Sequence, residues 1–192
     1  GRVEFGTGIG VHEHEFIRWG VDYYQRHEIA EEVLDVVKLA WTQDEVTYNG
    51  TYFQFEEALP QPKPYQEPHP PIWVACSRRD TIHLAAQKGI GALAFAFIDP
   101  EEAKYWVDDY YNTLAKEGVP IGDAVNANLA CVTGFMCHRD EDEAMRRGLE
   151  GANFFGYSLA HYYVFGRHRP GVTDVWEEFQ ARRAEHGYDP EA

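Results

Sequence analysis

Basic residues are scarce in this sequence. Its 192 residues include 17 Lys and Arg against 32 Asp and Glu, which gives a formal net charge of −15. A field of that sign repels nucleic-acid phosphates and anionic lipid headgroups. We therefore expect neither a nucleic acid nor a membrane surface as a partner. Hydrophobic residues make up 44% of the chain and aromatic residues 15%, which is ample for a packed core.

Long apolar runs and a cysteine pattern are also lacking. No run approaches the ~20 residues that span a bilayer, and the first residues lack the layout of a signal peptide. We therefore expect a cytoplasmic protein. The chain has three cysteines, Cys76, Cys131 and Cys137. Their number is odd, they are widely spaced, and they form no C-x-x-C motif. This argues against disulfides and a zinc site and predicts three buried thiols.

Strand and helix patterns alternate about four times along the chain. The runs at 72–76 and 90–98 are apolar on both faces, which is typical of parallel strands in a sheet that is covered on both sides. Residues 26–42 carry apolar side chains at three- and four-residue steps, as an amphipathic helix does. This pattern predicts an α/β barrel or a doubly wound sheet. The predicted helices cover 26–42, 81–88, a stretch from Pro100 with Asp99 as its N-cap, and 139–152.

Turn and proline signals separate these elements. The run "VTYNGTYFQF" predicts a β-hairpin with a two-residue turn at Asn49-Gly50. Six prolines within residues 60–71 favour an extended connection without strand pairing. A long strand is expected over 126–138. The aromatic-rich residues 153–165 are expected to be helical and to form core or a subunit interface, with a substrate wall as the alternative.

The segment "GTGIG" and the histidines that follow it invite two functional interpretations. A dinucleotide-binding G-x-G-x-x-G would need its last glycine where the chain has Val11 or Glu13, so that motif is absent. The glycines either let the backbone approach a ligand or make a tight turn. His12 and His14 could ligate a metal, but no second pair with suitable spacing accompanies them. We expect a polar loop there and no metal site.

The turn after the 72–76 strand could bind an anion. It lies at the carboxyl edge of the predicted sheet, where α/β proteins bind ligands, and the next helix points its N-terminal N–H groups at that edge. Ser77 and Thr81 add hydroxyls, and Arg78 and Arg79 add positive charge. An ordinary helix N-cap has the same composition, so the residues alone leave both interpretations open.

The order of the motifs is more specific than any one of them. "GRVEFGTGIG", "RHEIAEEVLDVVKLAWT", "VTYNGTYFQF" and "PKPYQEPHPPIWVACS" follow one another, and together they resemble the bacterial-luciferase-like family of flavin-dependent monooxygenases. The resemblance implies a (β/α)₈ barrel with the cofactor at the carboxyl ends of its strands. A whole barrel takes roughly 250 residues, so residues 1–192 are expected to form one incomplete domain. It would hold about the fourth to seventh β/α units and the C-terminal helices of a partial TIM barrel.

The resemblance also implies site residues. The turn after Phe5 would face the flavin, and the turn after Cys76 would bind its phosphate through backbone N–H groups and two hydroxyls. Many relatives have arginine where this chain has Ile9 and His27, which would leave the positive charge to Arg26, Arg78 or Arg79. The implied cofactor-binding residues are Thr7, Gly8, Ile9, Arg26, His27, Cys76, Ser77, Arg78 and Thr81.

The implied activity is that of a monooxygenase using reduced FMN and dioxygen on a small organic substrate. The catalytic histidine of the family, where present, lies on a strand outside this chain, so His12 and His14 are the weak candidates and the incomplete domain alone is expected to be inactive. A flavin reductase would supply the reduced FMN, and a homodimer is expected. Two alternatives stay open: an F420-dependent oxidoreductase on the same fold, and a non-catalytic subunit that binds flavin or serves dimerisation.

Overall fold

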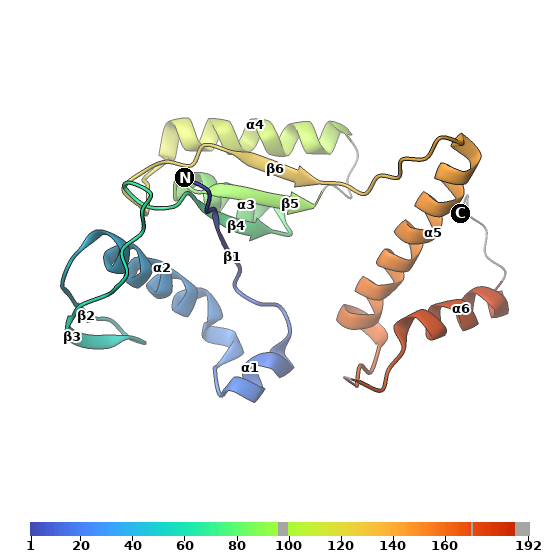
Figure 1. Cartoon of the computed structure of the whole chain (residues 1–192), viewed down its shortest axis with the longest axis horizontal. Helices are drawn as coiled ribbons and strands as arrows, with labels where there is room; N and C mark the ends of the chain where they lie inside the picture. Colours follow the sequence, from blue (N-terminus) through green and yellow to red (C-terminus); the bar gives the residue numbers. More distant parts are fainter. Residues whose placement is uncertain (96–99, 170, 187–192) are drawn as a thin grey trace. The chain divides into compact units, whose positions relative to one another are not determined.

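The computed structural model describes residues 1–95, 100–169 and 171–186 (Figure 1). The chain divides into two compact units, Gly1–Thr133 and Gly134–Ala192. Within the described residues, no helix is long and apolar enough to cross a membrane, and no group of three or more His, Cys, Asp or Glu side chains is placed to hold a metal ion. That the whole chain forms one domain stays a prediction.

Four parallel strands form the sheet of the first unit. Their order in space, β1-β4-β5-β6, follows their order along the chain. A barrel has this sequential order, whereas a doubly wound sheet reverses its order at a switch point. The α/β prediction is confirmed, and the sheet corresponds to an arc of a barrel. The strands are β1 (Phe5–Thr7), β4 (Ile72–Cys76), β5 (Gly91–Phe95) and β6 (Leu129–Val132).

Three helices connect these strands and cover one face of the sheet (Figure 1). They are α2 (Arg26–Thr42), α3 (Arg79–Gln87) and α4 (Pro100–Glu117). Ile82 of α3 and Tyr110 of α4 are fully buried with Cys76 and Ala92 of the sheet in one apolar cluster. Leu34 of α2 packs against the same cluster. The predicted helix over 26–42 is confirmed at both ends, and α3 begins two residues before the predicted Thr81.

The opposite face of the sheet has little cover. Trp73 lies opposite Gly91, and Ala75 lies opposite Leu93, so their side chains share the face away from the cluster. Ala75 is exposed there, and Val132 of β6 is 55% exposed. The prediction that the strands are covered on both sides is therefore wrong for the described residues. In a closed barrel, such an apolar second face forms the interior.

The hairpin differs from its prediction in the turn. Strands β2 (Val46–Asn49) and β3 (Gln54–Ala58) are antiparallel, with Asn49 opposite Gln54. The connection therefore has the residues 50–53, and the predicted two-residue turn at Asn49-Gly50 is wrong. The carboxylate of Glu32 in α2 accepts the backbone N–H groups of Tyr52 at 3.0 Å and Phe53 at 2.8 Å. This contact from a distant helix stabilises the longer turn.

Two further predictions are corrected near β6. Within the expected strand 126–138, only Leu129–Val132 pairs with β5. Because the pairing stops there, Cys137 lies in an irregular segment. Cys131 and Cys137 are exposed, so only Cys76 of the three predicted buried thiols is buried. The end of the 90–98 run and its following Asp99 N-cap lie outside the described residues, and the proline-rich 60–71 segment is without helix or strand, as predicted.

The second unit is a helical hairpin built on aromatic rings. Helix α5 (Glu141–Ala160) continues into a π-helical turn (His161–Phe165), and α6 (Val175–His186) returns beside it. The ring of Phe154 lies 4.8 Å from that of Trp176, and the ring of Tyr157 lies 5.4 Å from that of Phe179, centroid to centroid. The predicted helical, aromatic-rich segment is confirmed, and its rings form a core between α5 and α6.

Candidate functional site

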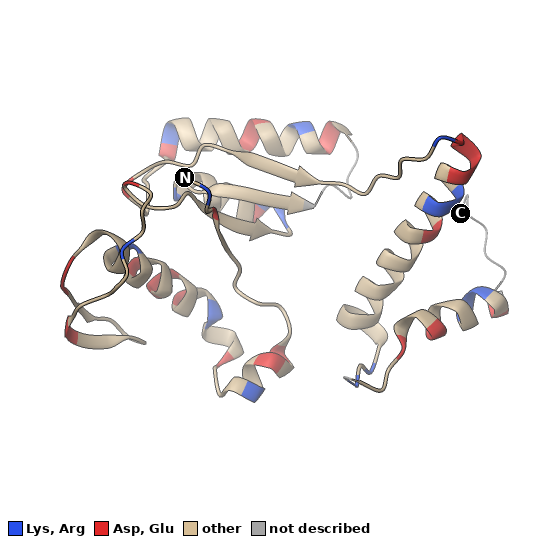
Figure 2. Cartoon of the chain, viewed as in Figure 1, with Lys and Arg blue, Asp and Glu red and all other residues tan. Residues whose placement is uncertain are grey.

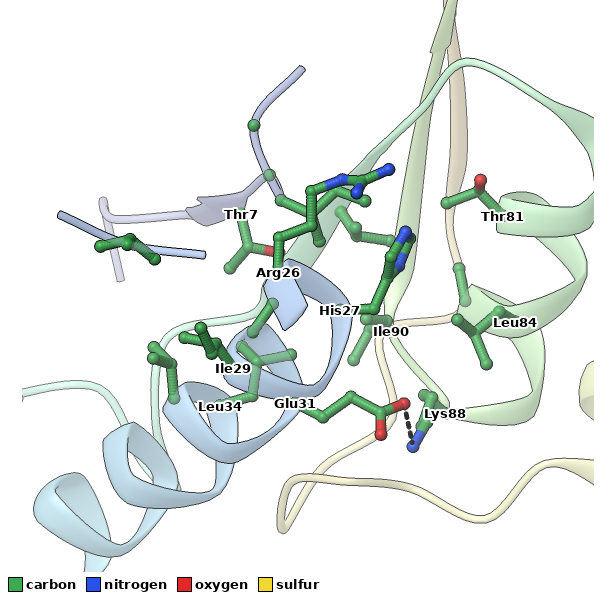
Figure 3. A pocket seen from close by; sticks show the side chains of 18 of the residues that line it. Thr7, Arg26, His27, Ile29, Glu31, Leu34, Thr81, Leu84, Lys88 and Ile90 are labelled. Atoms are coloured by element: carbon green, nitrogen blue, oxygen red, sulfur yellow. Dashed lines mark ion pairs between the residues drawn. The ribbon is translucent and has the colours of Figure 1, made fainter. Parts of the chain in front are cut away.

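A cavity of about 1020 Å³ lies in the first unit, between the end of β1 and the helices α2 and α3 (Figure 3). Drug-sized ligands and cofactors occupy cavities of about this volume. One end is polar and lies at the carboxyl ends of β1 and β4. The other part is mainly apolar, apart from Glu31 and Lys88. Its apolar side chains come mainly from α2 and α3, and two come from loops: Ile29, Val33, Leu34, Leu84, Ala85, Ile90 and Ile121.

The first turn of α2 places two basic side chains at the polar end. The 3₁₀ turn η1 (Tyr23–Gln25) leads into α2, and Asp22 caps it by accepting the N–H of Tyr24 at 2.8 Å. Helix α2 then begins at Arg26. Arg26 and His27 project between Thr7 and Thr81 in Figure 3, and all four residues line the cavity.

Arg26 is oriented by its neighbour Tyr23 and keeps unused donors. Its Nη1 donates to the backbone carbonyl of Tyr23 at 2.8 Å, and its guanidinium carbon lies 3.9 Å from the centre of the Tyr23 ring. Its Nε is buried without a hydrogen-bond partner among the described residues. A buried, unpaired N–H of a guanidinium is costly, so an acceptor such as an anion would stabilise this arrangement.

The end of β1 forms a second wall of the polar end. The hydroxyl of Thr7 donates to the carbonyl of Trp73 at 2.8 Å, which ties β1 to β4 and leaves the Thr7 oxygen available as an acceptor. Gly8, Ile9 and Gly10 continue this wall. A Cβ built on Gly8 would meet no atom within 4 Å, so the backbone is open to a ligand there. Gly10 has a φ of +75°, a conformation that favours glycine.

The turn after β4 contributes less to the cavity than the sequence predicts. Thr81 lines it, whereas Ser77 and Arg78 are exposed and lie outside its lining. Cys76 points into the core: its Sγ lies 3.4 Å from the carbonyl of Val74, and burial raises the pKa of the thiol to about 11. The roles of these three residues in cofactor binding stay predictions.

Arg79 takes no part in the cavity. Its guanidinium carbon lies 4.1 Å from the centre of the Tyr105 ring, and its Nε lies 3.6 Å from Oδ2 of Asp109. Both partners belong to α4. Among the basic residues proposed from the sequence to supply positive charge, the geometry therefore favours Arg26.

The two candidate catalytic histidines lie at the start of a helix. Helix α1 (Glu13–Trp19) includes His14, and His12 precedes it. The two rings are 5.1 Å apart, centroid to centroid, and neither residue lines the cavity. The predicted polar loop holds for His12, which has extended backbone, and is wrong for His14, which lies in the helix. A catalytic role of His12 or His14 stays a prediction.

Sequence reasoning missed the ion pair that bridges the cavity. Nζ of Lys88, the residue directly after α3, lies 3.2 Å from Oε1 of Glu31 in α2 (Figure 3). A regular spacing could have indicated the surface of α3, since its lining positions recur at three- and four-residue steps. These positions are 81, 84 and 85 on α3 and 88 directly after it, whereas the lining of α2 is nearly continuous, at positions 26, 27, 29, 30, 31, 33 and 34.

Two curated relatives are named as flavin-dependent monooxygenases. The chain is 29% identical over 150 residues to the FMNH(2)-dependent dimethylsulfone monooxygenase of Pseudomonas putida, which is 76% of this chain and 39% of that protein. It is 32% identical over 91 residues to the oxygenase component of the flavin-dependent trigonelline monooxygenase of Acinetobacter baylyi, 46% of this chain and 25% of that protein. The chain spans less than half the length of these relatives.

Solved structures show the same fold over nearly the whole chain. Monooxygenase RslO1 from Streptomyces bottropensis superposes with a TM-score of 0.69 at 21% identity, over 96% of this chain and 52% of that one. An F420-dependent secondary alcohol dehydrogenase superposes with a TM-score of 0.65 at 20% identity, over 100% of this chain and 54% of that one. The chain thus has about half of the fold of these proteins.

The family assignment agrees with the strand order and with the place of the cavity. The profile of the luciferase-like monooxygenase family matches residues 1–191, nearly the entire chain. The dimethylsulfone monooxygenase is named as FMNH(2)-dependent, and structurally similar proteins bind FMN or F420. This chain belongs to the luciferase-like monooxygenase family.

Proposed function

We propose that this chain is part of a flavin-dependent monooxygenase that uses reduced FMN and dioxygen on a small organic substrate. One observation carries the proposal: a single cavity collects most of the residues that the sequence resemblance implied for the cofactor. They come from three separate segments, the end of β1, the start of α2 and the start of α3. Those residues are Thr7, Gly8, Ile9, Arg26, His27 and Thr81.

The polar end fits a phosphate group. Arg26 has the charge and the donors for charge-assisted hydrogen bonds to phosphate oxygens, and its buried Nε has no partner among the described residues. The Thr81 hydroxyl can donate one more bond, and the N-terminus of α3 adds a favourable dipole. His27 would add positive charge when protonated. We propose that these three side chains bind the flavin phosphate.

The described residues suggest how the chemistry is divided between cofactor and protein. Bound reduced flavin supplies the electrons that activate dioxygen for transfer of an oxygen atom to the substrate. The chain's own contribution is to bind the phosphate, to orient the cofactor along the glycine wall after β1, and to exclude water with apolar side chains. We assign no acid or base to the described residues. A separate flavin reductase and a homodimer remain part of the proposal.

A binding titration of the full-length protein tests this function. We expect FMN or reduced FMN to bind, and Arg26→Ala to weaken binding about tenfold or more, since hydrogen bonds to a charged group are lost. Lys38→Ala is the matched control, because Lys38 lies on the same helix and does not line the cavity. No affinity for FMN in either redox state, or equal effects of the two substitutions, would contradict the proposal.

An F420-dependent oxidoreductase is the second candidate. It is favoured by the superposition of the F420-dependent secondary alcohol dehydrogenase over the whole chain. Oxygen uptake separates the two activities. A monooxygenase consumes dioxygen in step with its reduced cofactor and substrate, whereas an F420-dependent oxidoreductase turns over equally well under anaerobic conditions.

A further inference from the structure

Helix α1 forms a wall of the cavity but is itself barely packed. Glu15, Phe16, Arg18 and Trp19 line the cavity, yet α1 has no buried residue. Trp19 is 83% exposed, the highest value among the large apolar residues of this helix. An exposed tryptophan at the wall of an apolar cavity has much to gain from covering a ligand, because burial of its indole removes a large apolar surface from water.

Glycines flank this helix at both ends. Gly10 has a φ of +75° and Gly20 a φ of +68°, and the Gly20 N–H closes the helix by donating to the carbonyl of Ile17 at 3.2 Å. The ring of Phe16 in α1 packs against that of Tyr23, at 5.4 Å between centroids. Segments with few buried contacts open and close at low free-energy cost, and chain reversals at glycine accommodate such movement.

We propose that α1 closes over the nucleotide bound in the cavity and that Trp19 and Arg18 contact it. This inference rests on the proposed flavin binding and adds two ligand-contacting residues to it. Trp19 would cover the apolar part of the nucleotide. Arg18 would bring a second guanidinium toward the phosphate bound at Arg26.

The charges on α1 determine which of the two contacts matters more. Glu15 lines the same wall as Arg18, and its carboxylate repels a phosphate while the guanidinium attracts it. Arg18 and Glu15 therefore partly cancel. Trp19 has no such opposition, so we expect it to contribute more to affinity than Arg18.

Ile17 provides a matched control on the same helix. It is 69% exposed and does not line the cavity, so its removal changes the apolar surface of α1 without removing a ligand contact. In the full-length protein, we expect Trp19→Ala to weaken FMN binding about tenfold and Ile17→Ala to change it less than about twofold. Because both side chains are exposed, thermal unfolding should be nearly unchanged in both variants.

Proteolysis measures the closure directly. Trypsin cleaves after Arg18, and we expect saturating FMN to slow that cleavage in the wild type and in Ile17→Ala, but not in Trp19→Ala. If FMN binds and Arg26→Ala weakens it, while Trp19→Ala behaves as Ile17→Ala and cleavage after Arg18 is unaffected by FMN, the closure is wrong and the proposed function stands. If the wild type binds no FMN, both the closure and the proposed function are wrong.

Discussion

Arg26 shows how one side chain can attract an anion in a strongly acidic protein. The net charge of −15 acts over long distances and is screened beyond about 10 Å at 0.1 M salt. At contact distance, the positive charge of Arg26 outweighs this screened negative field. Tyr23 fixes the Arg26 guanidinium through its backbone carbonyl and its ring, so little side-chain entropy is lost when a ligand binds.

The buried hydroxyl of Tyr110 contributes to the stability of the first unit. This oxygen lies 2.9 Å from the carbonyl of Ile90 and 3.0 Å from that of Asn126, and burial raises the pKa of Tyr110 to about 12. Tyr110→Phe keeps the packing but removes the donor, so we expect the free energy of unfolding in urea to fall by about 1–2 kcal/mol. Tyr111→Phe should change it by less than about 0.5 kcal/mol, because Tyr111 is 45% exposed. Equal losses would contradict this role.

Helices and strands whose sequence signals lie within their own residues could be predicted from the sequence. Helix α2 and strand β4 have the predicted bounds, since each combines a clear period or apolar run with a distinct end. The hairpin turn could not be predicted, because Glu32 stabilises it from another element. Strand β6 was predicted too long for a similar reason: its end depends on pairing with β5, and no local signal marks Val132.

The part of the candidate site that lies near the carboxyl ends of β1 and β4 could be predicted from the sequence. Thr7 ends β1, and Thr81 lies in the first turn of the helix that follows β4, so their meeting at one edge of the sheet follows from the fold. The orientation of Arg79 toward α4 could not be predicted, since Tyr105 and Asp109 attract it across a helix interface. Trp19 was missed because its seven-residue helix is too short to show a period.

Helix α5 depends on pH through its first turn, where acidic residues precede arginines (Figure 2). Hydrogen bonds from Arg146 and Arg147 lower the pKa of Glu143 from its ordinary 4.5 to about 2. Because the folded-state pKa is depressed, this stabilisation is present above pH 4.5 and is lost as the pH falls through about 2. We expect the Glu143 carboxyl carbon to titrate near pH 2 by NMR.

Two substitutions control for that titration. Glu143→Gln should remove the loss of helical signal in the first turn of α5 between pH 4.5 and about 2. Glu141→Gln should keep it, because Glu141 lies in the same turn without an arginine hydrogen bond among the described residues. A Glu143 midpoint close to 4.5 would show that the arginines do not hold the carboxylate.

At the scale of the whole molecule, the sheet of the first unit has one face that this unit covers and one face that it leaves open. The chain spans 52% and 54% of the two structures it superposes on, and the open face carries apolar side chains from Trp73, Ala75 and Leu93. Exposed apolar surface of this kind marks a surface that another part of a protein covers. We propose that the complete protein closes this face into the interior of a barrel.

A charge placed on the open face distinguishes a barrel interior from a solvent-facing surface. Ala75 is exposed here, so Ala75→Asp should change the stability of the 192-residue chain by less than about 0.5 kcal/mol. In a closed barrel the same carboxylate would be buried without a partner, and we expect the complete protein to lose about 3 kcal/mol or more, measured by urea unfolding. Ser77→Asp is the control, since Ser77 lies just past the same strand and is exposed. If the complete protein tolerates Asp at position 75 as well as at position 77, the face is open to solvent and the barrel does not close over it.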